Sequence, residues 1–359
     1  MRPAARARRW LCIATFAALC GEASAQAPVP APGATPEGPA RATPALEFLC
    51  SVPSDWCIAL ASTFSKETGI PVRTTQKAPA DALALLTSQR SRPRYDIWYA
   101  GVGDLHIDAA QAGLTDEYRS PVLPELREWS TRFAEQSGRR SVALYQRAIG
   151  IVVNTRLLEA KQLAEPRCWS DLADARYDDQ LQMANPSQGA TTRATIVALA
   201  EVYGEVRAFD VLKRVHENVA KYARRGTNAA RAVARGDVTL AIAYLYEGAN
   251  EVAGGFPVKL VTPCEGLAFD VVAMSIVKGA RSPENAQRFY DWALSPASLA
   301  LQYQFDFWQM PAHLQTPLHA HVLNTDTAKT IPNDYEHFTP ETRRRMYAVW
   351  ERDVGVLPR

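Results

Sequence analysis

The sequence predicts an α/β fold in two lobes, each built on a mostly parallel sheet flanked by helices. Strand-like apolar runs alternate with helix-like runs over residues 45–101, which is typical of parallel strands joined by right-handed crossovers. The alternation starts again at residue 140. About 315 residues follow the N-terminal leader, and a chain of that length is too long for one ordinary hydrophobic core.

The chain begins with the features of a secretory signal peptide. A basic head of four arginines precedes an apolar stretch at 10–20, and the small-x-small residues at 23–25 predict cleavage after Ala25. The apolar stretch is too short to span a bilayer, which takes about 20 residues. Cys20 lacks the neighbours of a lipoprotein cleavage site, and the residues after Arg8-Arg9 fit a twin-arginine signal poorly. We expect export to the periplasm and removal of residues 1–25.

A tether is expected after the leader. Residues 26–44 are rich in Pro and Ala and have no apolar periodicity, so they cannot bury enough surface to fold. Removing the leader, with its four arginines and Glu22, leaves 36 basic and 37 acidic residues of the 40 and 38 in the full chain. This near-neutral balance gives no support for a nucleic-acid partner.

The folded part opens with a strand at 45–52, followed by a helix that Ser54 caps and Gly69 ends. Three residues of this helix fall on one apolar face: Trp56, Leu60 and Phe64. The elements expected next are a strand at 70–76, a helix at 80–89 and a strand at 95–101.

The second series of elements begins with a long strand at 140–155. The continuous apolar run at 237–248 predicts a strand buried on both faces. Ser282-Pro283-Glu284 and Ser295-Pro296 each open a helix, because a capping Ser and a Pro at the first helical position favour that start. The other expected elements are helical stretches at 168–172 and about 191–223, and strands at 256–264 and 269–279.

Four cysteines remain after the leader, and an even number in an exported protein predicts two disulfides, with three possible connectivities. A zinc site or a redox pair needs closely spaced ligands such as C-x-x-C, which the chain lacks. Cys50 ends the first strand and Cys57 lies in the first turn of the next helix. A bond between them would fix the loop at the carboxyl edge of the sheet, where open α/β sheets bind ligands.

Catalytic motifs are missing from the sequence. There is no G-x-S-x-G, no G-x-x-x-x-G-K-[ST] and no H-E-x-x-H, and "GVGDLH" has two of the three glycines of a dinucleotide fingerprint. We therefore expect no enzymatic activity and no cofactor.

Several blocks together carry a family resemblance: "C…WC" at 50–57, "GDLH" at 103–106, "ANP" at 184–186, "ARGDV" at 234–238 and "PCEG" at 263–266. With them, residues 46–307 resemble the periplasmic substrate-binding proteins of ABC transporters. The similarity is to the family 1 extracellular solute-binding group, in the branch of ferric-iron and phosphorylated-sugar receptors. The resemblance implies a type II binding-protein fold, in which two lobes joined by crossing strands close over a ligand.

The resemblance also implies a division of the chain. Lobe 1 is expected at 45–148 plus 270–330, lobe 2 at 149–269, and a C-terminal helical segment at 331–359. The disulfides implied are Cys50–Cys57 in lobe 1 and Cys168–Cys264 in lobe 2. The partner implied for the monomeric receptor is an inner-membrane ABC permease; related receptors instead present their closed form to a membrane sensor kinase, and the sequence does not separate the two.

Helix starts that face the cleft would supply the ligand site, since they present backbone N–H groups and a positive dipole end to an anion. Gly101 and Gly103 lack side chains that would hinder close approach of the backbone. The candidates at four predicted strand-to-helix junctions are Ser51, Gly103, Asp104, Ser187, Gln188, Thr191, Arg225 and Thr227. The resemblance adds three residues: Tyr246, Glu247 and Glu265. We expect Glu265→Ala to abolish ligand binding without unfolding the protein.

The sequence departs from the phosphorylated-sugar branch at several of these positions. Tyr246-Glu247 replaces a His-Asp pair and Arg225 replaces a Ser, while Gln188-Gly189-Ala190-Thr191 and Leu267-Ala268 replace Ser-Ser-Gly-Thr and Thr-Gly. Arginine suits bidentate recognition of phosphate or carboxylate. The function expected is thus that of a periplasmic receptor for a small anionic, phosphorylated solute, with hexose phosphate in doubt.

A ferric-iron receptor is the metal alternative. Tyr244 and Tyr246 are two residues apart and would point to the same face of a strand, with Glu247 as a third ligand. A buried strand also carries Tyr for packing, so the primary expectation is that no metal binds. His313, His319 and His321 lie outside the recognised blocks and are expected in a surface loop.

Overall fold

The computed structural model describes residues 44–187, 189–223 and 226–357. The predicted signal peptide and almost all of the predicted tether lie outside these residues, as do Gln188 and Arg225; for Thr227 the backbone alone is described. Among the described residues, no helix has both the length and the apolar character needed to cross a membrane.

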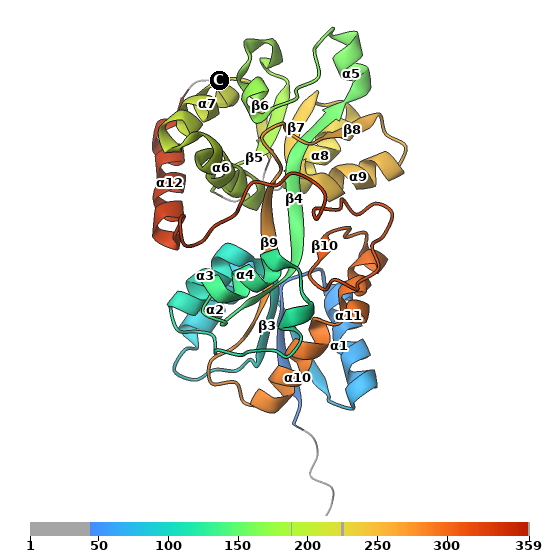
Figure 1. Ribbon diagram of the computed structural model, residues 1–359, viewed down its shortest axis with the longest axis vertical. Coiled ribbons are helices and arrows are strands. Elements are labelled where there is room, and N and C mark those ends of the chain that lie inside the picture. Colours follow the sequence, from blue (N-terminus) through green and yellow to red (C-terminus); the bar gives the residue numbers. More distant parts are fainter. Residues whose placement is uncertain (1–43, 188, 224–225, 358–359) are drawn as a thin grey trace, which may run out of the picture. The chain divides into compact units, whose positions relative to one another are not determined.

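The described residues form a mixed ten-stranded sheet with the order β2-β1-β3-β9-β4-β7-β5-β6, and β8 and β10 also pair with β4 (Figure 1). Strands β1 to β3 are parallel to one another, as are β5 to β7. The bounds are β1 Leu46–Cys50, β2 Val72–Gln76, β3 Ile97–Val102, β4 Val142–Asn154, β5 Leu181–Ala184, β6 Val219–Ala223, β7 Leu240–Tyr244, β8 Val258–Val261, β9 Ala268–Ile276 and β10 Met310–Pro311.

Strand β4 connects the two parallel groups. Its first part pairs antiparallel with β9, from Val142 to Ile149, and its last part pairs with β7 and β8, from Ile149 to Asn154. Strand β9 in turn pairs with β3. The predicted α/β class, with two mostly parallel groups joined by crossing strands, is therefore confirmed. The described residues form one compact unit, so the lobe boundaries stay a prediction.

Helices follow most of the parallel strands. Helix α1 ends at Gly69, whose φ of 73° gives the left-handed conformation common at helix ends. Pro53, and not the predicted Ser54, occupies the capping position of α1, and Ser54 is its first helical residue. The α-helices are α1 Ser54–Thr68, α2 Pro79–Ser88, α3 Gly103–Gln111, α4 Glu128–Gln136, α5 Thr155–Ala160, α6 Ala190–Tyr203, α7 Glu205–Glu217, α8 Gly226–Arg235, α9 Leu245–Ala253, α10 Pro283–Ala293, α11 Pro296–Ala300 and α12 Pro340–Asp353. Short 3₁₀ turns are η1 Leu123–Glu125, η2 Trp169–Ala173, η3 Ala175–Tyr177 and η4 Leu301–Phe305.

Two sequence expectations for this region were wrong. The predicted helix at about 191–223 is α6 and α7, separated by Gly204 with φ 75°, followed by strand β6. The predicted strand at 237–248 is the short β7 followed by α9. Both α9 and β7 are buried, and a continuous apolar run does not by itself distinguish a buried helix from a buried strand.

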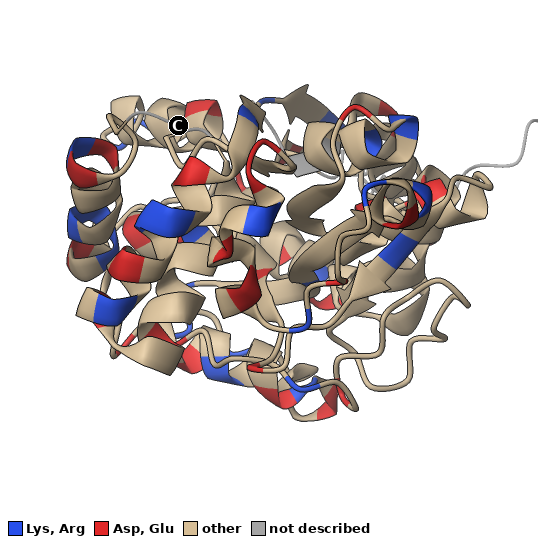
Figure 2. Cartoon of the chain, turned by 90° about the horizontal axis from the view of Figure 1, so that it is seen from above, with Lys and Arg blue, Asp and Glu red and all other residues tan. Residues whose placement is uncertain are grey.

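Two large apolar clusters lie on the two parts of the sheet. Phe48, Trp56 and Tyr99 belong to the first, and Trp169 and Ile196 to the second. Met346, Trp350 and Val354 of α12 also pack into the second cluster, so the C-terminal helix is part of a core. Lys and Arg are interspersed with Asp and Glu along the helices, including α12 (Figure 2).

Both expected disulfides are present. Cys50–Cys57 joins the end of β1 to α1, and both residues are fully buried. Cys168–Cys264 joins the residue before η2 to the turn between β8 and β9. The second bond closes a sequence separation of 96 residues, against 7 for the first.

Candidate functional site

Six helices begin shortly after parallel strands of the sheet, among the described residues. These are α1, α3, α6, α8 and α9, which follow β1, β3, β5, β6 and β7, and α2 follows β2 in the same way, so the N-termini of all six lie at the carboxyl ends of parallel strands. This is the edge at which open α/β sheets bind ligands. The predicted junctions are therefore in the expected places, and the contacts made there decide which side chains are available to a solute.

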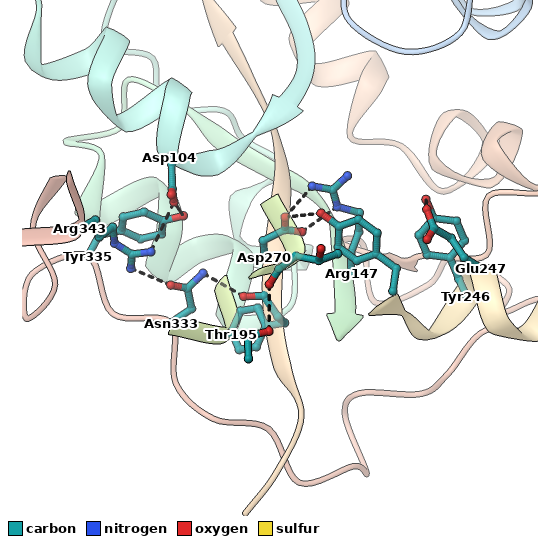
Figure 3. A network of polar contacts seen from close by, with 12 residues as sticks. Asp104, Arg147, Thr195, Tyr246, Glu247, Asp270, Asn333, Tyr335 and Arg343 are labelled. Atoms are coloured by element: carbon teal, nitrogen blue, oxygen red, sulfur yellow. Dashed lines mark hydrogen bonds and ion pairs between the residues drawn. The ribbon is translucent and has the colours of Figure 1, made fainter. Parts of the chain in front are cut away.

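An ion pair lies at the middle of this region. Arg147 on β4 and Asp270 on β9 are cross-strand partners, and the Nε and Nη2 groups of Arg147 each donate a 2.7 Å hydrogen bond to one carboxylate oxygen of Asp270 (Figure 3). The Tyr244 hydroxyl donates to Asp270 Oδ2 at 2.7 Å, and the Arg147 guanidinium lies 4.4 Å from the centre of the Tyr244 ring. The pair is thus fixed from two sides.

Sequence reasoning missed Arg147 and Asp270. A signal was present, because each is a charged residue inside an apolar strand, in "ALYQRAIGI" and "AFDVVAM". Burial alone would lower the pKa of Arg147, but Asp270 and then the neighbouring tyrosines together raise it by more, so the pKa rises on balance and the guanidinium stays charged. A buried charge in a strand is retained only with a partner, and the partner here is the neighbouring strand's carboxylate.

Tyr246 and Glu247 lie beside this pair, in the first turn of α9 (Figure 3). The strand spacing expected for Tyr244 and Tyr246 is wrong, because β7 ends at Tyr244. Their rings nevertheless stack, with centres 5.7 Å apart. Tyr246 Oη donates to Glu247 Oε1 at 3.4 Å, and Glu247 is buried. Burial, and then neighbouring acids, raise the pKa of both tyrosines, so both phenols are neutral donors.

An aromatic series continues from Tyr246 to α1. The ring of Phe307 lies 5.9 Å from that of Tyr246 and 5.0 Å from that of Trp56. Trp56 is fully buried in the first core cluster. The start of α9 and the start of α1, from the two parts of the sheet, are therefore connected through Phe307.

The Asp104 carboxylate accepts hydrogen bonds from side chains of the C-terminal segment. Its Oδ1 accepts hydrogen bonds from Tyr335 Oη at 2.8 Å and Arg343 Nη1 at 3.4 Å, and its Oδ2 accepts from Tyr347 Oη at 3.2 Å (Figure 3). Arg343 also donates to Asn333 Oδ1 at 2.7 Å. The Asp104 carboxylate is therefore hydrogen-bonded within the chain, and its expected role as a ligand contact stays a prediction.

The glycines of this loop serve the packing of the protein. A Cβ at Gly103 would lie 2.6 Å from Val271 and 2.8 Å from Phe133, so the missing side chain makes room for core residues; the expected backbone contact with a ligand stays a prediction. Gly101 has φ 115°, a conformation that L residues rarely adopt. Ser51, the candidate from the first junction, accepts a hydrogen bond from Trp98 Nε1 at 3.1 Å through its Oγ.

Thr191 is the most notable candidate at the start of α6. It is 1% exposed, and its Oγ1 has no hydrogen-bond partner among the described residues. Ser187 is exposed and its hydroxyl donates to Asn185 Oδ1 at 2.7 Å. Nothing can be added for Gln188, Arg225 and the Thr227 side chain, which fall outside the described part of the chain.

Glu265 binds the start of η2. Its Oε2 accepts from the backbone N–H of Trp169 at 2.8 Å, and its Oε1 accepts from Ser170 N–H at 3.4 Å and from the Tyr203 hydroxyl. Burial, and then this bond to Glu265, raise the pKa of Tyr203 to about 12. Cys168 and Cys264 lie next to Glu265, but their sulfurs are bonded to each other and are not free thiolates. The ligand role of Glu265 stays a prediction.

The three histidines do not behave alike. His319 and His321 are exposed, as expected, and both stack on Trp308. His313 is buried instead, with its Nε2 3.2 Å from the Glu125 carboxylate. The structure thus gathers Arg147, Tyr244, Tyr246, Glu247 and Asp270 into one cluster, while Glu265 binds the start of η2 and His313 lies beside Glu125.

Residues 93–336 match the family described as bacterial extracellular solute-binding protein. The chain belongs to this family. The solute-binding protein is also 30% identical over 329 residues to an uncharacterized protein of Haemophilus influenzae, covering 91% of this chain and 95% of that one.

Two further relatives are named for their ligands. The structure of the periplasmic binding protein AfuA from Actinobacillus pleuropneumoniae, with exogenous fructose-6-phosphate bound, aligns with a TM-score of 0.79 at 29% identity, over 87% of this chain and 99% of that one. A putative 2-aminoethylphosphonate-binding periplasmic protein of Salmonella typhimurium is 23% identical over 272 residues, covering 72% of this chain and 74% of the relative. Ferric-binding proteins at 19% identity or less share the fold alone.

Proposed function

We propose that this solute-binding protein is a periplasmic receptor for a small solute carrying a phosphate ester or phosphonate group, which it delivers to an inner-membrane ABC permease. It performs no chemistry of its own. Its ligand lies at the carboxyl ends of the parallel strands, and the contacts come from Arg147, Thr191, Tyr246 and Glu247. Ser51, Gln188, Arg225, Thr227 and Glu265 are retained as further candidates.

The observation that carries the proposal is the cluster around Arg147. A guanidinium held in place by Asp270 is a ready donor for an anion, and Thr191 places an unpartnered hydroxyl, within the described residues, at the start of α6. The N-terminus of a helix adds N–H groups and a positive dipole end. Glu247 is a buried acid that can accept hydrogen bonds from the hydroxyl or ammonium groups of the same solute.

The relatives support the same class of solute. AfuA was solved with fructose-6-phosphate, and the Salmonella relative is named for 2-aminoethylphosphonate. Both molecules combine a tetrahedral phosphorus anion with polar groups that donate hydrogen bonds. The Tyr246-Glu247 pair differs from the His-Asp pair expected for sugar-phosphate receptors, so the two probes should be tested side by side.

Native mass spectrometry of the purified protein tests the solute class. If the receptor keeps its ligand through purification, denaturation should release a small molecule with a mass on the order of a few hundred daltons, as expected for a small phosphate ester. This molecule should contain phosphorus. Calorimetric titration with fructose 6-phosphate and with 2-aminoethylphosphonate then measures the affinity. A released molecule without phosphorus, together with no heat from either probe, would contradict the proposal.

A ferric-iron receptor is the second candidate, because Tyr244, Tyr246 and Glu247 do lie together. The contacts of Tyr244 favour the phosphate or phosphonate solute over iron. Its hydroxyl already donates a hydrogen bond to Asp270, and the Arg147 guanidinium lies over its ring. An iron-sized mass increment in the native spectrum would reverse this order.

A further inference from the structure

The guanidinium of Arg147 has one edge that no described residue uses. An arginine carries five N–H groups, and Asp270 accepts from Nε and from Nη2, which form one edge of the plane. Two N–H groups of Nη1 and one of Nη2 remain, and one N–H from each nitrogen forms the adjacent edge. In Figure 3 this end of the guanidinium points away from Asp270.

The remaining edge is held rigidly. Arg147 and Asp270 face each other in the register of β4 and β9, Tyr244 Oη donates to Asp270, and the Tyr244 ring lies against the guanidinium. Because these contacts fix the plane, little side-chain freedom is left for a ligand to remove on binding. A rigid fork of two N–H groups matches the spacing of two oxygens on one phosphate or carboxylate.

Solvent reaches the group despite its burial. The Arg147 side chain is 15% exposed and that of Asp270 is 6% exposed, so the arginine is the more accessible member of the pair. Since three of its N–H groups have no acceptor among the described residues, water or a solute must satisfy them. Helix α6 carries Thr191 in its first turn. This helix packs against β9, the strand that contains Asp270.

We infer that Arg147 is a specificity-determining residue that binds the anionic group of the solute through its Nη1–Nη2 edge, and that Asp270 and Tyr244 are positioning residues for it. The inference rests on the proposed function and deepens it. A pair that is neutral overall attracts an anion weakly at long range, so discrimination comes from directed hydrogen bonds at contact. The site therefore selects a group with two oxygens on one atom, and in the proposed solute that group is a phosphate monoester or a phosphonate.

Calorimetric titration of the purified protein with fructose 6-phosphate and 2-aminoethylphosphonate tests the assignment. Arg147→Lys keeps the charge and removes the fork, so the Kd for the probe that the wild type binds should rise about 30-fold or more. Arg147→Gln with Asp270→Asn keeps a neutral hydrogen-bonding pair and should abolish measurable binding. Arg127→Lys is the matched control, because Arg127 is also largely buried and paired with an acid, Asp326, but lies in neither β4 nor β9. Its Kd should stay within about threefold of the wild type.

The possible results separate the two proposals. A wild type that binds neither probe overturns the solute class, and the role of Arg147 with it. A wild type that binds a probe, with Arg147→Lys within threefold of it, overturns the role of Arg147 alone. If Arg147→Lys does not fold, Tyr244→Phe removes only the hydroxyl that holds Asp270 and should raise the Kd about three- to tenfold with the melting temperature retained; an unchanged Kd there also overturns the assignment.

Discussion

The hydroxyl of Tyr335 donates a 2.8 Å hydrogen bond to Asp104, and this bond ties the C-terminal segment to the first turn of α3. Arg343 reinforces it, since its side chain is 3% exposed and lies over the Tyr335 ring at 4.0 Å. Met346 and Trp350 of the same segment pack into the second core cluster. The segment therefore connects α3, from one part of the sheet, to the core on the other part.

Asp104→Ala should lower the free energy of unfolding by about 2 kcal/mol, because hydrogen bonds to charged groups contribute about 1.5–3 kcal/mol. Arg343 keeps its bonds to Phe338 O and Asn333 Oδ1, so the loss stays below that of a fully orphaned buried charge. Urea denaturation measures the change.

Asp108→Ala is the control, because its partner Arg344 is 61% exposed and exposed pairs contribute about 0–1 kcal/mol. Solute affinity should be unchanged in the Asp104 variant, since the C-terminal segment already occupies this carboxylate. A variant of wild-type stability that loses solute binding would return Asp104 to the ligand site.

His106 should make the protein acid-sensitive. The ring is fully buried, Nε2 donates to Ala100 O at 3.2 Å, and Nδ1 accepts from Ser275 Oγ at 2.7 Å. Burial lowers the pKa of His106 to about 3, while the unfolded chain titrates near 6.5. The pKa of His106 is lower in the folded protein than in the unfolded chain, so the neutral ring contributes to the stability of the fold. This contribution is complete above pH 6.5 and is lost as the pH falls from 6.5 toward 3, by about 1.4 kcal/mol per pH unit.

His106→Gln can keep both hydrogen bonds without titrating. Between pH 7 and pH 5 the wild type should lose about 2 kcal/mol more stability than this variant, measured by urea denaturation at each pH. The exposed His321→Gln serves as the matched control for the loss of a histidine. Parallel pH curves for the wild type and His106→Gln would show that the ring does not stay neutral in the folded protein.

The sequence was most informative where local chemistry decides the structure. The helix that starts after Cys50 and ends at Gly69, and the long strand β4, follow from apolar spacing and from glycine at a helix end. The apolar run at 237–248 was wrongly predicted to be one strand. The change from β7 to α9 falls between Tyr244 and Leu245, and both of these residues are buried. No local pattern marks that boundary.

The candidate site was predictable only in part. Tyr246 and Glu247 were found through the resemblance, and Thr191 through its place before a helix. Arg147 and Asp270 are 123 residues apart and meet only because β4 and β9 pair in one register, which no local pattern fixes. The partners of Asp104 were missed for the same reason, since Tyr335 and Arg343 reach it from more than 200 residues away.

The two disulfides should contribute unequally to stability. In the chain-entropy model a loop closed over 96 residues is worth about 4.7 kcal/mol and one closed over 7 about 2.5 kcal/mol. Cys168→Ser with Cys264→Ser should therefore cost about 2 kcal/mol more than Cys50→Ser with Cys57→Ser, by urea denaturation. Equal losses would mean that burial of Cys50 and Cys57, and not loop length, sets the contribution of the shorter bridge.

Ferric iron should not bind at the paired tyrosines. Burial raises the pKa of Tyr244 and Tyr246. The Tyr244 hydroxyl donates its hydrogen bond to Asp270 Oδ2, and Arg147 donates to both oxygens of that carboxylate. An iron ion would have to remove both phenolic protons beside a fixed guanidinium, which repels a trivalent cation. Titration of the purified protein with ferric citrate should therefore produce no visible tyrosinate-to-iron absorption band. A band that appears in the wild type and disappears in Tyr246→Phe would establish iron ligation and exclude the phosph(on)ate assignment of this cluster.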